Sequence, residues 1–315
     1  MEQQEGLIAK AQQILTQVRG AVVGKDSQLL WVLAAILAGG HILMEDIPGV
    51  GKTTLALAFS KALGLAHNRV QFTPDVLPSD VTGYSVADRE GKLTYRPGAV
   101  LCNLFLADEL NRATSRTQAA LLEAMEEGQV TVDGVSHRLP EPFVVIATQN
   151  PTGAAGTQLL PDSQMDRFMV RLTLGYPDHK AEIAMAKERQ GKNPLDAVRT
   201  VIDARELMLL RRLVADTYIS DELIAYVVDV ISATRQDEQL LRGASPRATL
   251  AVIAMAKAAA RLGGRDYVVP QDIRQVLLTT VSHRLLLTHT ARSQGITEDA
   301  VLEGILERIP APKMR

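Results

Sequence analysis

The sequence predicts an α/β unit, built on a parallel sheet with helices on both faces, followed by an all-helical unit. Short apolar runs alternate with helical patterns in the first half of the chain, and strand-like runs disappear from the second half. Strands separated by helices favour a parallel sheet that is covered on both sides. Because 315 residues are about twice an ordinary domain length, we expect two domains, at residues 1–193 and 194–315.

Five apolar runs in the first half are predicted to be strands. HILMED leads into a glycine-containing loop, and residues 53–63 form the helix that follows the loop. NRVQFT is the second run, and LCNLFLADE is the third, with the apolar character of a strand covered on both faces. FVVIATQNP and FMVRLTL complete the set. Between the third and fourth runs, RATSRTQAALLEAMEEG is predicted to be a helix ended by Gly128.

Helical periodicity dominates the second half, after a connector at GKNPLDAVRT. Apolar residues recur with the i, i+3, i+4, i+7 spacing at Ile224, Val227, Val228 and Ile231, and again within residues 273–281. The alanine-rich run TLAVIAMAKAAARLGG is a further helix. The second domain is therefore expected to be a helical bundle.

Composition limits the possible functions. A formal charge of −2 gives no general attraction to nucleic acid or to an anionic membrane. The single cysteine, Cys102, excludes an internal disulfide framework and a cysteine-based zinc site. No apolar run approaches the roughly 18 residues of a membrane helix, and the amino terminus is unlike a signal peptide. We expect a cytoplasmic protein.

The loop in EDIPGVGKTTLA has the features of a phosphate-binding loop. Gly49 and Gly51 allow the backbone N–H groups to curl toward a phosphate at a helix N-terminus, Lys52 reaches the outer phosphates, and the Thr53 hydroxyl binds Mg²⁺. The general pattern also has a glycine where this chain has Asp46, and a glycine-rich turn without a ligand is the alternative. The predicted nucleotide-binding residues are Pro48, Gly49, Val50, Gly51, Lys52, Thr53 and Thr54.

Polar residues end the third and fourth predicted strands. In a parallel sheet these ends face the crevice that also holds the glycine loop. Asp108 could hold Mg²⁺ through water, Glu109 could orient or deprotonate the attacking water, and Asn150 could position that water. Taken alone, the acidic pair could equally start a solvated loop, and Asn-Pro could be a turn.

Three arginines follow these segments. Arg112 follows the acidic pair, Arg167 precedes the fifth predicted strand, and Arg247 lies where Ser245 and Pro246 start a helix. By composition alone, each is an ordinary exposed arginine.

The ordered set of motifs resembles the MoxR family of AAA+ ATPases, and the resemblance covers nearly the whole chain. The motifs are, in order, EDIPGVGKTTLA, LPSDVTGY, YRPGAV, LFLADELNRATSRTQAALLEAMEEGQVTVDG, VVIATQNP, LPDSQMDRF and GASPRAT. The resemblance implies an AAA+ αβα nucleotide-binding core with a helical lid, and hydrolysis of ATP to ADP with Mg²⁺. By similarity, Lys52 and Thr53 match Walker A, Asp108 and Glu109 match Walker B, and Asn150 matches sensor 1.

The two remaining arginines also have counterparts in the family. Arg247 matches sensor 2, a lid arginine that reaches the phosphates. Arg167 matches the arginine finger, which would act on ATP bound by a neighbouring subunit. Such families assemble as rings, usually hexamers, so the resemblance implies that the first partner is another copy of this chain.

Two segments are similar to family insertions. Residues 78–98 resemble the helix-2 insert, and residues 128–142 resemble the hairpin before sensor 1. The alternative is that both are plain surface hairpins, since DREGK and VDGV are simply turn sequences.

The resemblance implies chaperone-like remodelling or maturation of protein complexes, including insertion of metal cofactors, with a von Willebrand A domain partner. Because this chain ends ILERIPAPKMR, we expect that partner to be a separate polypeptide. A nucleic-acid motor is one alternative, but the hairpin segment VADREGKLTYR mixes acidic with basic residues. An ATP-gated scaffold is another, and Glu109 argues mildly against it.

Overall fold

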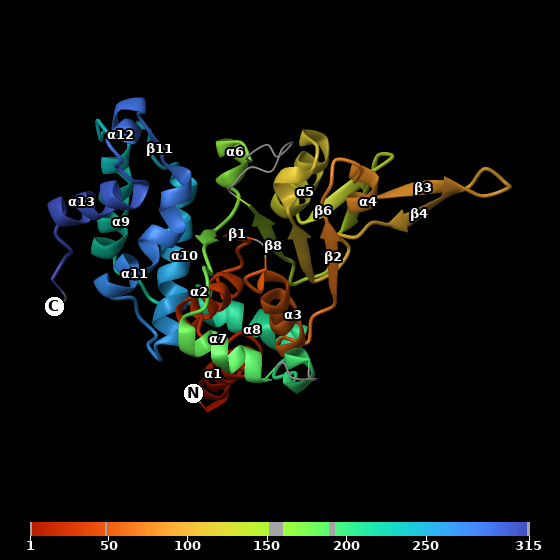
Figure 1. Ribbon diagram of the computed structural model, residues 1–315, viewed down its shortest axis with the longest axis horizontal. Helices are drawn as coiled ribbons and strands as arrows, with labels where there is room; N and C mark the ends of the chain where they lie inside the picture. Colours follow the sequence, from red (N-terminus) through yellow and green to blue (C-terminus); the bar gives the residue numbers. More distant parts are fainter. Residues whose placement is uncertain (1, 48, 151–159, 189–192, 314–315) are drawn as a thin grey trace.

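The computed structural model describes residues 2–47, 49–150, 160–188 and 193–313. A central parallel sheet is covered by helices on both faces, and the helices from residue 221 onward, the lid, lie beside one edge of the sheet (Figure 1). The hairpin of β3 (Gly83–Ala87) and β4 (Leu93–Pro97) projects from the side opposite the lid (Figure 1). The predicted fold class is confirmed.

The core domain alternates strands and helices, as the sequence predicts. Besides β3 and β4, its elements in chain order are α1 (Glu2–Ala21), α2 (Asp26–Leu37), β1 (Ile42–Glu45), α3 (Lys52–Ala62), β2 (His67–Gln71), α4 (Pro78–Thr82), β5 (Leu104–Asp108), η1 (Leu110–Arg112), α5 (Ser115–Glu127), β6 (Gln129–Val132), β7 (Val135–Arg138), β8 (Val144–Gln149), α6 (Asp162–Met165), β9 (Val170–Leu172) and α7 (His179–Glu188).

The five strands of the main sheet are the five apolar runs of the sequence. Their order is β2-β5-β8-β1-β9, and the registered neighbours are all parallel. Every residue of β5 and β8 is buried, as expected for central strands with helices on both faces. The carboxyl ends of β5 and β8 therefore lie beside that of β1, which leads into the glycine loop.

Local sequence sets the helix and hairpin ends. Helix α5 starts where the Thr114 hydroxyl accepts a hydrogen bond from the backbone of Thr117, and it ends at Gly128, whose φ is 62°. The β6–β7 hairpin turns at Asp133 and Gly134, both with positive φ. Both hairpins expected from the sequence are present.

The lid is helical, apart from one short antiparallel ribbon of β10 and β11 that the sequence did not predict. Within α9 the predicted apolar stripe is broken, since Val228 is 43% exposed. The elements after residue 193 are η2 (Pro194–Ala197), α8 (Ala204–Ala215), α9 (Asp221–Thr234), β10 (Leu240–Arg242), α10 (Pro246–Leu262), α11 (Pro270–Val281), η3 (Ser282–Arg284), β11 (Leu286–Leu287), α12 (His289–Ser293) and α13 (Glu298–Arg308).

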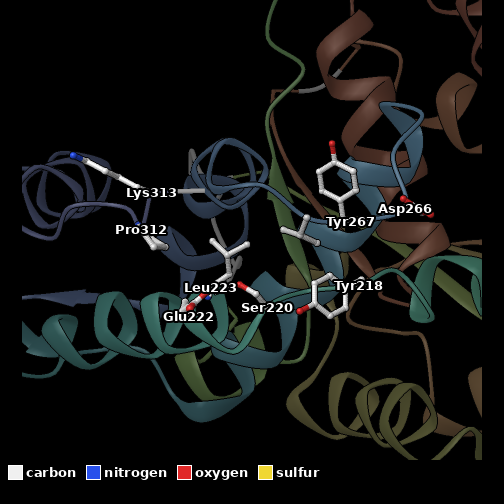
Figure 2. Close-up of a pocket in the computed structure, with 9 residues that line it drawn as sticks. Tyr218, Ser220, Glu222, Leu223, Asp266, Tyr267, Pro312 and Lys313 are labelled. Atoms are coloured by element: carbon white, nitrogen blue, oxygen red, sulfur yellow. Dashed lines mark hydrogen bonds between the residues drawn. The ribbon is translucent and has the colours of Figure 1, made fainter. Parts of the chain in front are cut away.

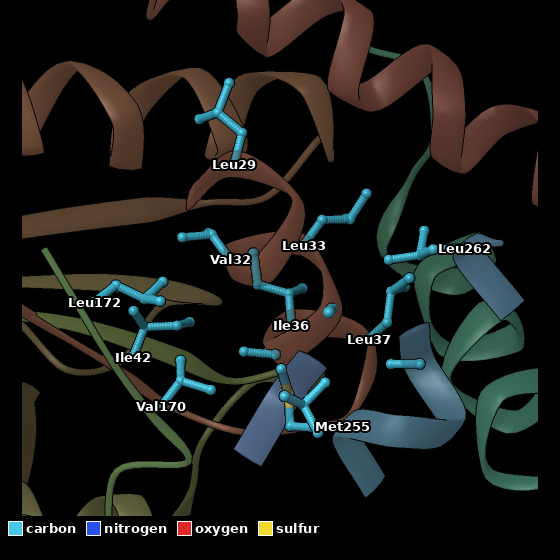
Figure 3. Packing of buried hydrophobic residues seen from close by; sticks show 14 of the residues in the cluster. Leu29, Val32, Leu33, Ile36, Leu37, Ile42, Val170, Leu172, Met255 and Leu262 are labelled. Carbon is cyan, nitrogen blue, oxygen red and sulfur yellow. The ribbon is translucent and has the colours of Figure 1, made fainter. Parts of the chain in front are cut away.

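The lid and the core domain share one hydrophobic cluster. Ile36 of α2 lies between Val170 of the sheet and Met255 of α10 (Figure 3). On the opposite face of the sheet, a second cluster packs α5 against β5 and β8. None of the helices in the described part of the chain is long and apolar enough to cross a membrane.

Candidate active site

The loop between β1 and α3 has the geometry of a phosphate-binding loop. Gly49 and Gly51 take φ values of 87° and 96°, a region that side-chain-bearing residues avoid. Helix α3 starts directly after Gly51, so its unpaired N–H groups and its partial positive charge point into the loop. The predicted residue Pro48 lies outside the described residues.

Asp46 anchors this loop to the sheet edge. Its carboxylate accepts hydrogen bonds from its neighbour Ile47 (3.0 Å) and, after β9, from the backbone N–H groups of Leu174 and Gly175 (2.9 Å to Gly175). The carboxylate is buried, and it stands where the general pattern has glycine. The departure from that pattern therefore has a structural role in this chain.

Lys52 is held at the base of the loop. Its Nζ donates to the backbone oxygen of Asp46 at 2.9 Å, and the residue is only 9% exposed. Burial lowers the pKa of the Lys52 ammonium, and the negative charges of Asp46, Asp108 and Glu109 oppose that effect. The ammonium is therefore fixed among carboxylates, where a phosphate would be attracted to it.

The carboxylates at the end of β5 are oriented by the neighbouring strands. Thr148 of β8 donates to Asp108 at 2.6 Å and accepts from the backbone N–H of Glu109 at 2.8 Å. Glu109 adopts φ 55°, a rare conformation for a residue with a side chain. Its carboxylate pairs with Arg112 at 2.8 Å. Such backbone strain is typical of functional sites.

A cavity of about 310 Å³ brings most of the predicted nucleotide-site residues together. Its lining includes residues from the loop, from α3 and from the ends of β5 and β8, and one arginine from β2. The lining residues are Gly49, Gly51, Lys52, Thr53, Thr54, Arg69, Asp108, Glu109 and Asn150.

Arg69 is the lining residue that the sequence analysis missed. It lies on β2, and its guanidinium donates to Asp108 at 2.8 Å and to Gln71 at 3.1 Å. The sequence carried no signal for this contact, because only the sheet order shows that β2 pairs with β5.

The donors in this cavity fit a magnesium ion. The Thr53 hydroxyl and the Asp108 carboxylate are the hard oxygen ligands that Mg²⁺ prefers. The described residues contain no cluster of three or more His, Cys, Asp or Glu side chains suited to a metal. Proteins commonly bind Mg²⁺ through one or two protein oxygens together with phosphates.

The two other predicted arginines lie at a different place. Arg167 and Arg247 line a separate cavity of about 140 Å³, together with His41, Met125 and Glu126. One Glu126 oxygen accepts from Arg167 at 2.8 Å, and the other accepts from Arg247. Burial raises the pKa of Glu126, but the two arginines outweigh burial, and the pKa is lowered overall.

A third cavity, of about 880 Å³, lies in the lid. Figure 2 shows Tyr218 near Ser220 at the start of α9, Tyr267 across from them, and Pro312 and Lys313 from the chain end. It contains none of the residues expected to bind nucleotide. The lining of the cavity at Lys52, in turn, contains no described residue of the lid.

Known proteins resemble this chain over both domains. The family described as "ATPase family associated with various cellular activities (AAA)" matches residues 41–170, and the AAA lid domain matches residues 232–305. Chaperone MoxR1 of Mycobacterium tuberculosis is 37% identical, covering 98% of this chain and 85% of that protein.

Two further relatives match nearly end to end. The uncharacterized protein YeaC of Bacillus subtilis is 40% identical over 100% of this chain and 99% of its own length. The crystal structure of a Cytophaga hutchinsonii protein, to which ATPase activity has been ascribed, superposes with a TM-score of 0.91 at 34% identity, covering 99% of this chain and 98% of that one. The chain thus belongs to the MoxR family of AAA+ ATPases and is an ATPase.

Proposed function

We propose that this ATPase hydrolyses Mg-ATP at the interfaces of a ring, a hexamer as is usual in its family, and uses the energy to remodel or mature protein complexes. The observation that carries the proposal is the separation of two sets of residues. The phosphate loop and its carboxylates line one cavity, whereas Arg167 and Arg247 line another. A second subunit can bring the two sets together.

Within one site, the residues divide the work. The N–H groups of the loop and Lys52 would bind the phosphates, while Thr53 and Asp108 would hold the magnesium ion. The ion, when bound, neutralises charge on the phosphates. Glu109 orients or deprotonates the attacking water, and Asn150 positions it. Because phosphoryl transfer depends mainly on positioning and charge neutralisation, these groups suffice only when a cation also reaches the far side of the γ-phosphate.

That cation comes from the neighbour in this proposal. Arg167 and Arg247 are both surface residues, with side chains 31% and 45% exposed, and both are paired with Glu126. A γ-phosphate from an adjoining subunit would compete with the Glu126 carboxylate for the same guanidinium groups. Arg247 therefore acts as sensor 2 on the neighbour's nucleotide rather than on its own.

The exposed side chains of the β3–β4 hairpin favour a protein substrate over a nucleic-acid substrate. This projecting hairpin carries three exposed apolar or aromatic residues: Tyr84 is 52% exposed, Val86 is 41% exposed and Leu93 is 61% exposed. Exposed apolar side chains of this kind mark protein contacts. A von Willebrand A domain protein as partner, and metal-cofactor insertion as one task, follow from the family resemblance.

Mixed assemblies test the proposal. Arg167→Ala should lower turnover by about 10³-fold or more while ATP still binds, and Lys52→Ala should lose ATP binding. If the finger acts between subunits, mixing the two inactive proteins restores ATPase activity, because a Lys52→Ala subunit lends its Arg167 to the intact site of its neighbour. Wild-type turnover per subunit that is unaffected by dilution to monomers contradicts the proposal.

A further inference from the structure

The segment that carries Arg167 is held from both sides by one buried arginine of the lid. Arg284 ends η3, and its side chain is only 2% exposed. Its Nη1 donates to the backbone oxygen of Asp166 at 3.0 Å, and its Nη2 donates to the backbone oxygen of Phe168 at 2.8 Å. These two carbonyl groups belong to the residues immediately before and after Arg167.

Further contacts from the lid reinforce this grip. Arg284 also forms an ion pair with the Asp166 carboxylate, and Ser245 of the lid donates to the same carboxylate at 3.0 Å. The ring Nε2 of His283 lies 3.0 Å from the backbone oxygen of Phe168. Arg247 lies 3.8 Å from the Asp166 carboxylate as well, so the lid contacts both flanks of Arg167 through four side chains.

The guanidinium of Arg284 is itself fixed. Its Nε donates to the backbone oxygen of Thr280 in α11 at 2.9 Å, so the side chain is anchored to its own domain. Burial lowers the pKa of Arg284, and the Asp166 carboxylate opposes that effect. A buried arginine that makes four such hydrogen bonds is costly to leave unpaired, so the contact resists separation of the lid from this segment.

The side chain of Arg167 reaches the surface of this segment. The Phe168 side chain is fully buried, and the backbone N–H of Met169 donates to the oxygen of His41 at 2.9 Å. By contrast, the Arg167 side chain is 31% exposed, and its Nε forms an ion pair with the Glu126 carboxylate. The backbone of the segment is thus fixed while the guanidinium stays at the surface.

We propose that Arg284 is a positioning residue for ATP hydrolysis: it fixes the backbone of Arg167 from the lid, and so sets how that guanidinium meets ATP on the adjoining subunit. This inference rests on the proposed trans role of Arg167. Movement of the lid in one subunit is transmitted through Arg284 to the active site of the next. The position of the lid in one subunit therefore sets the position of Arg167 at the nucleotide of the next subunit.

The expected effect follows from how sharply catalysis depends on position. A displacement of about 1 Å in a catalytic group can cost about 10²-fold in rate, and a whole arginine finger contributes 10³- to 10⁵-fold. Arg284→Lys keeps the positive charge, but one ammonium cannot reproduce the planar fork that reaches both carbonyl groups. We expect turnover to fall by about 10²-fold in Arg284→Lys and further in Arg284→Met.

The experiment measures ATP binding, thermal unfolding and ATPase activity for Arg284→Lys, Arg284→Met and a control, Arg265→Met. Arg265 forms a two-bond ion pair with Asp272, at 2.6 and 2.8 Å, and donates to the backbone oxygen of Tyr267, so these contacts lie within the lid. The control therefore perturbs lid stability without touching that segment. ATP affinity should remain at the wild-type value in both Arg284 variants, because no described lid residue lines the cavity at Lys52.

Mixing with Lys52→Ala then separates positioning from a merely structural role. If Arg284 acts on the neighbour's site, mixtures of Arg284→Lys with Lys52→Ala regain activity above the sum of the two proteins alone, as mixtures with Arg167→Ala do. If only the Arg167→Ala mixtures recover, or if Arg284→Lys alone keeps full turnover, the inference is overturned while the proposed function stands. If neither mixture recovers, the trans role of Arg167 is overturned and the inference with it.

Discussion

Replacing Asp46 with glycine should destabilise this protein, although it would make the loop match the general phosphate-loop pattern. The carboxylate of Asp46 is buried and accepts backbone hydrogen bonds from Ile47, Leu174 and Gly175. Glycine offers no acceptor to any of them. The loop would match the pattern better, and its attachment to the segment after β9 would be lost.

The magnitude follows from the number of donors left without an acceptor. The N–H of Leu174 is buried, and an unsatisfied buried donor costs about 1–3 kcal/mol. Ile47 and Gly175 are partly buried, so their N–H groups regain some water, and the added glycine costs about 0.5–1 kcal/mol in chain entropy. We therefore expect the free energy of unfolding to fall by about 2–5 kcal/mol. At roughly 2–4 °C per kcal/mol, Tm should drop by about 4–20 °C.

Thermal unfolding of Asp46→Gly, Asp46→Asn and a control, Asp75→Gly, measures this effect. Asp46→Asn keeps one acceptor oxygen and should lie between wild type and glycine, while the exposed Asp75 should tolerate the same change. Because Lys52 contacts the backbone oxygen of Asp46, the lysine contact is preserved in every variant. An Asp46→Gly protein that unfolds within about 1 °C of wild type would refute the anchoring role.

Three other predictions concern the two cavities and pH. Glu109→Gln should bind ATP normally and hydrolyse it at least 10²-fold more slowly, about the contribution of a general base, in single-turnover assays; equal loss of binding would argue against its role. Glu126→Gln should shift the unfolding free energy by only about 1 kcal/mol, since the Glu126 side chain that pairs with Arg167 and Arg247 is itself 38% exposed, yet it should change the ATP concentration for half-maximal turnover. Burial lowers the pKa of His41 to about 4, below the unfolded value near 6.5. The stability of the neutral form is therefore present above pH 6.5, and about 3 kcal/mol is lost as the pH falls toward 4. Urea unfolding of wild type and His41→Gln between pH 4 and 8 should show that difference.

Much of the fold could be predicted because its signals are local. The unbroken apolar runs of β5 and β8 require burial on both faces, and the Asp133–Gly134 turn requires positive φ. The grouping of the predicted nucleotide-site residues in one cavity was expected from the rule that parallel strands end at one edge of the sheet. That rule brings Lys52, Asp108 and Asn150 together without knowledge of the strand order.

What could not be predicted depends on contacts between distant segments. Arg69 reaches Asp108 only because β2 pairs with β5, a fact of strand order that no spacing along the chain reveals. The position of Arg247 likewise depends on how the lid packs. Its motif matched a residue that reaches phosphates, but nothing in the motif says whose phosphates those are.

The shared hydrophobic cluster explains why Arg247 and Arg167 lie together. Met255 of α10 packs with Ile36 of α2 in that cluster, so the lid helix that starts beside Arg247 is seated on the core domain (Figure 3). Rotating the lid toward the chain's own Lys52 would expose this apolar surface and unpair the buried Arg284. Bringing a neighbour's nucleotide to both arginines breaks neither contact. The packing that holds the lid in place therefore favours a site completed between subunits over one completed within the chain.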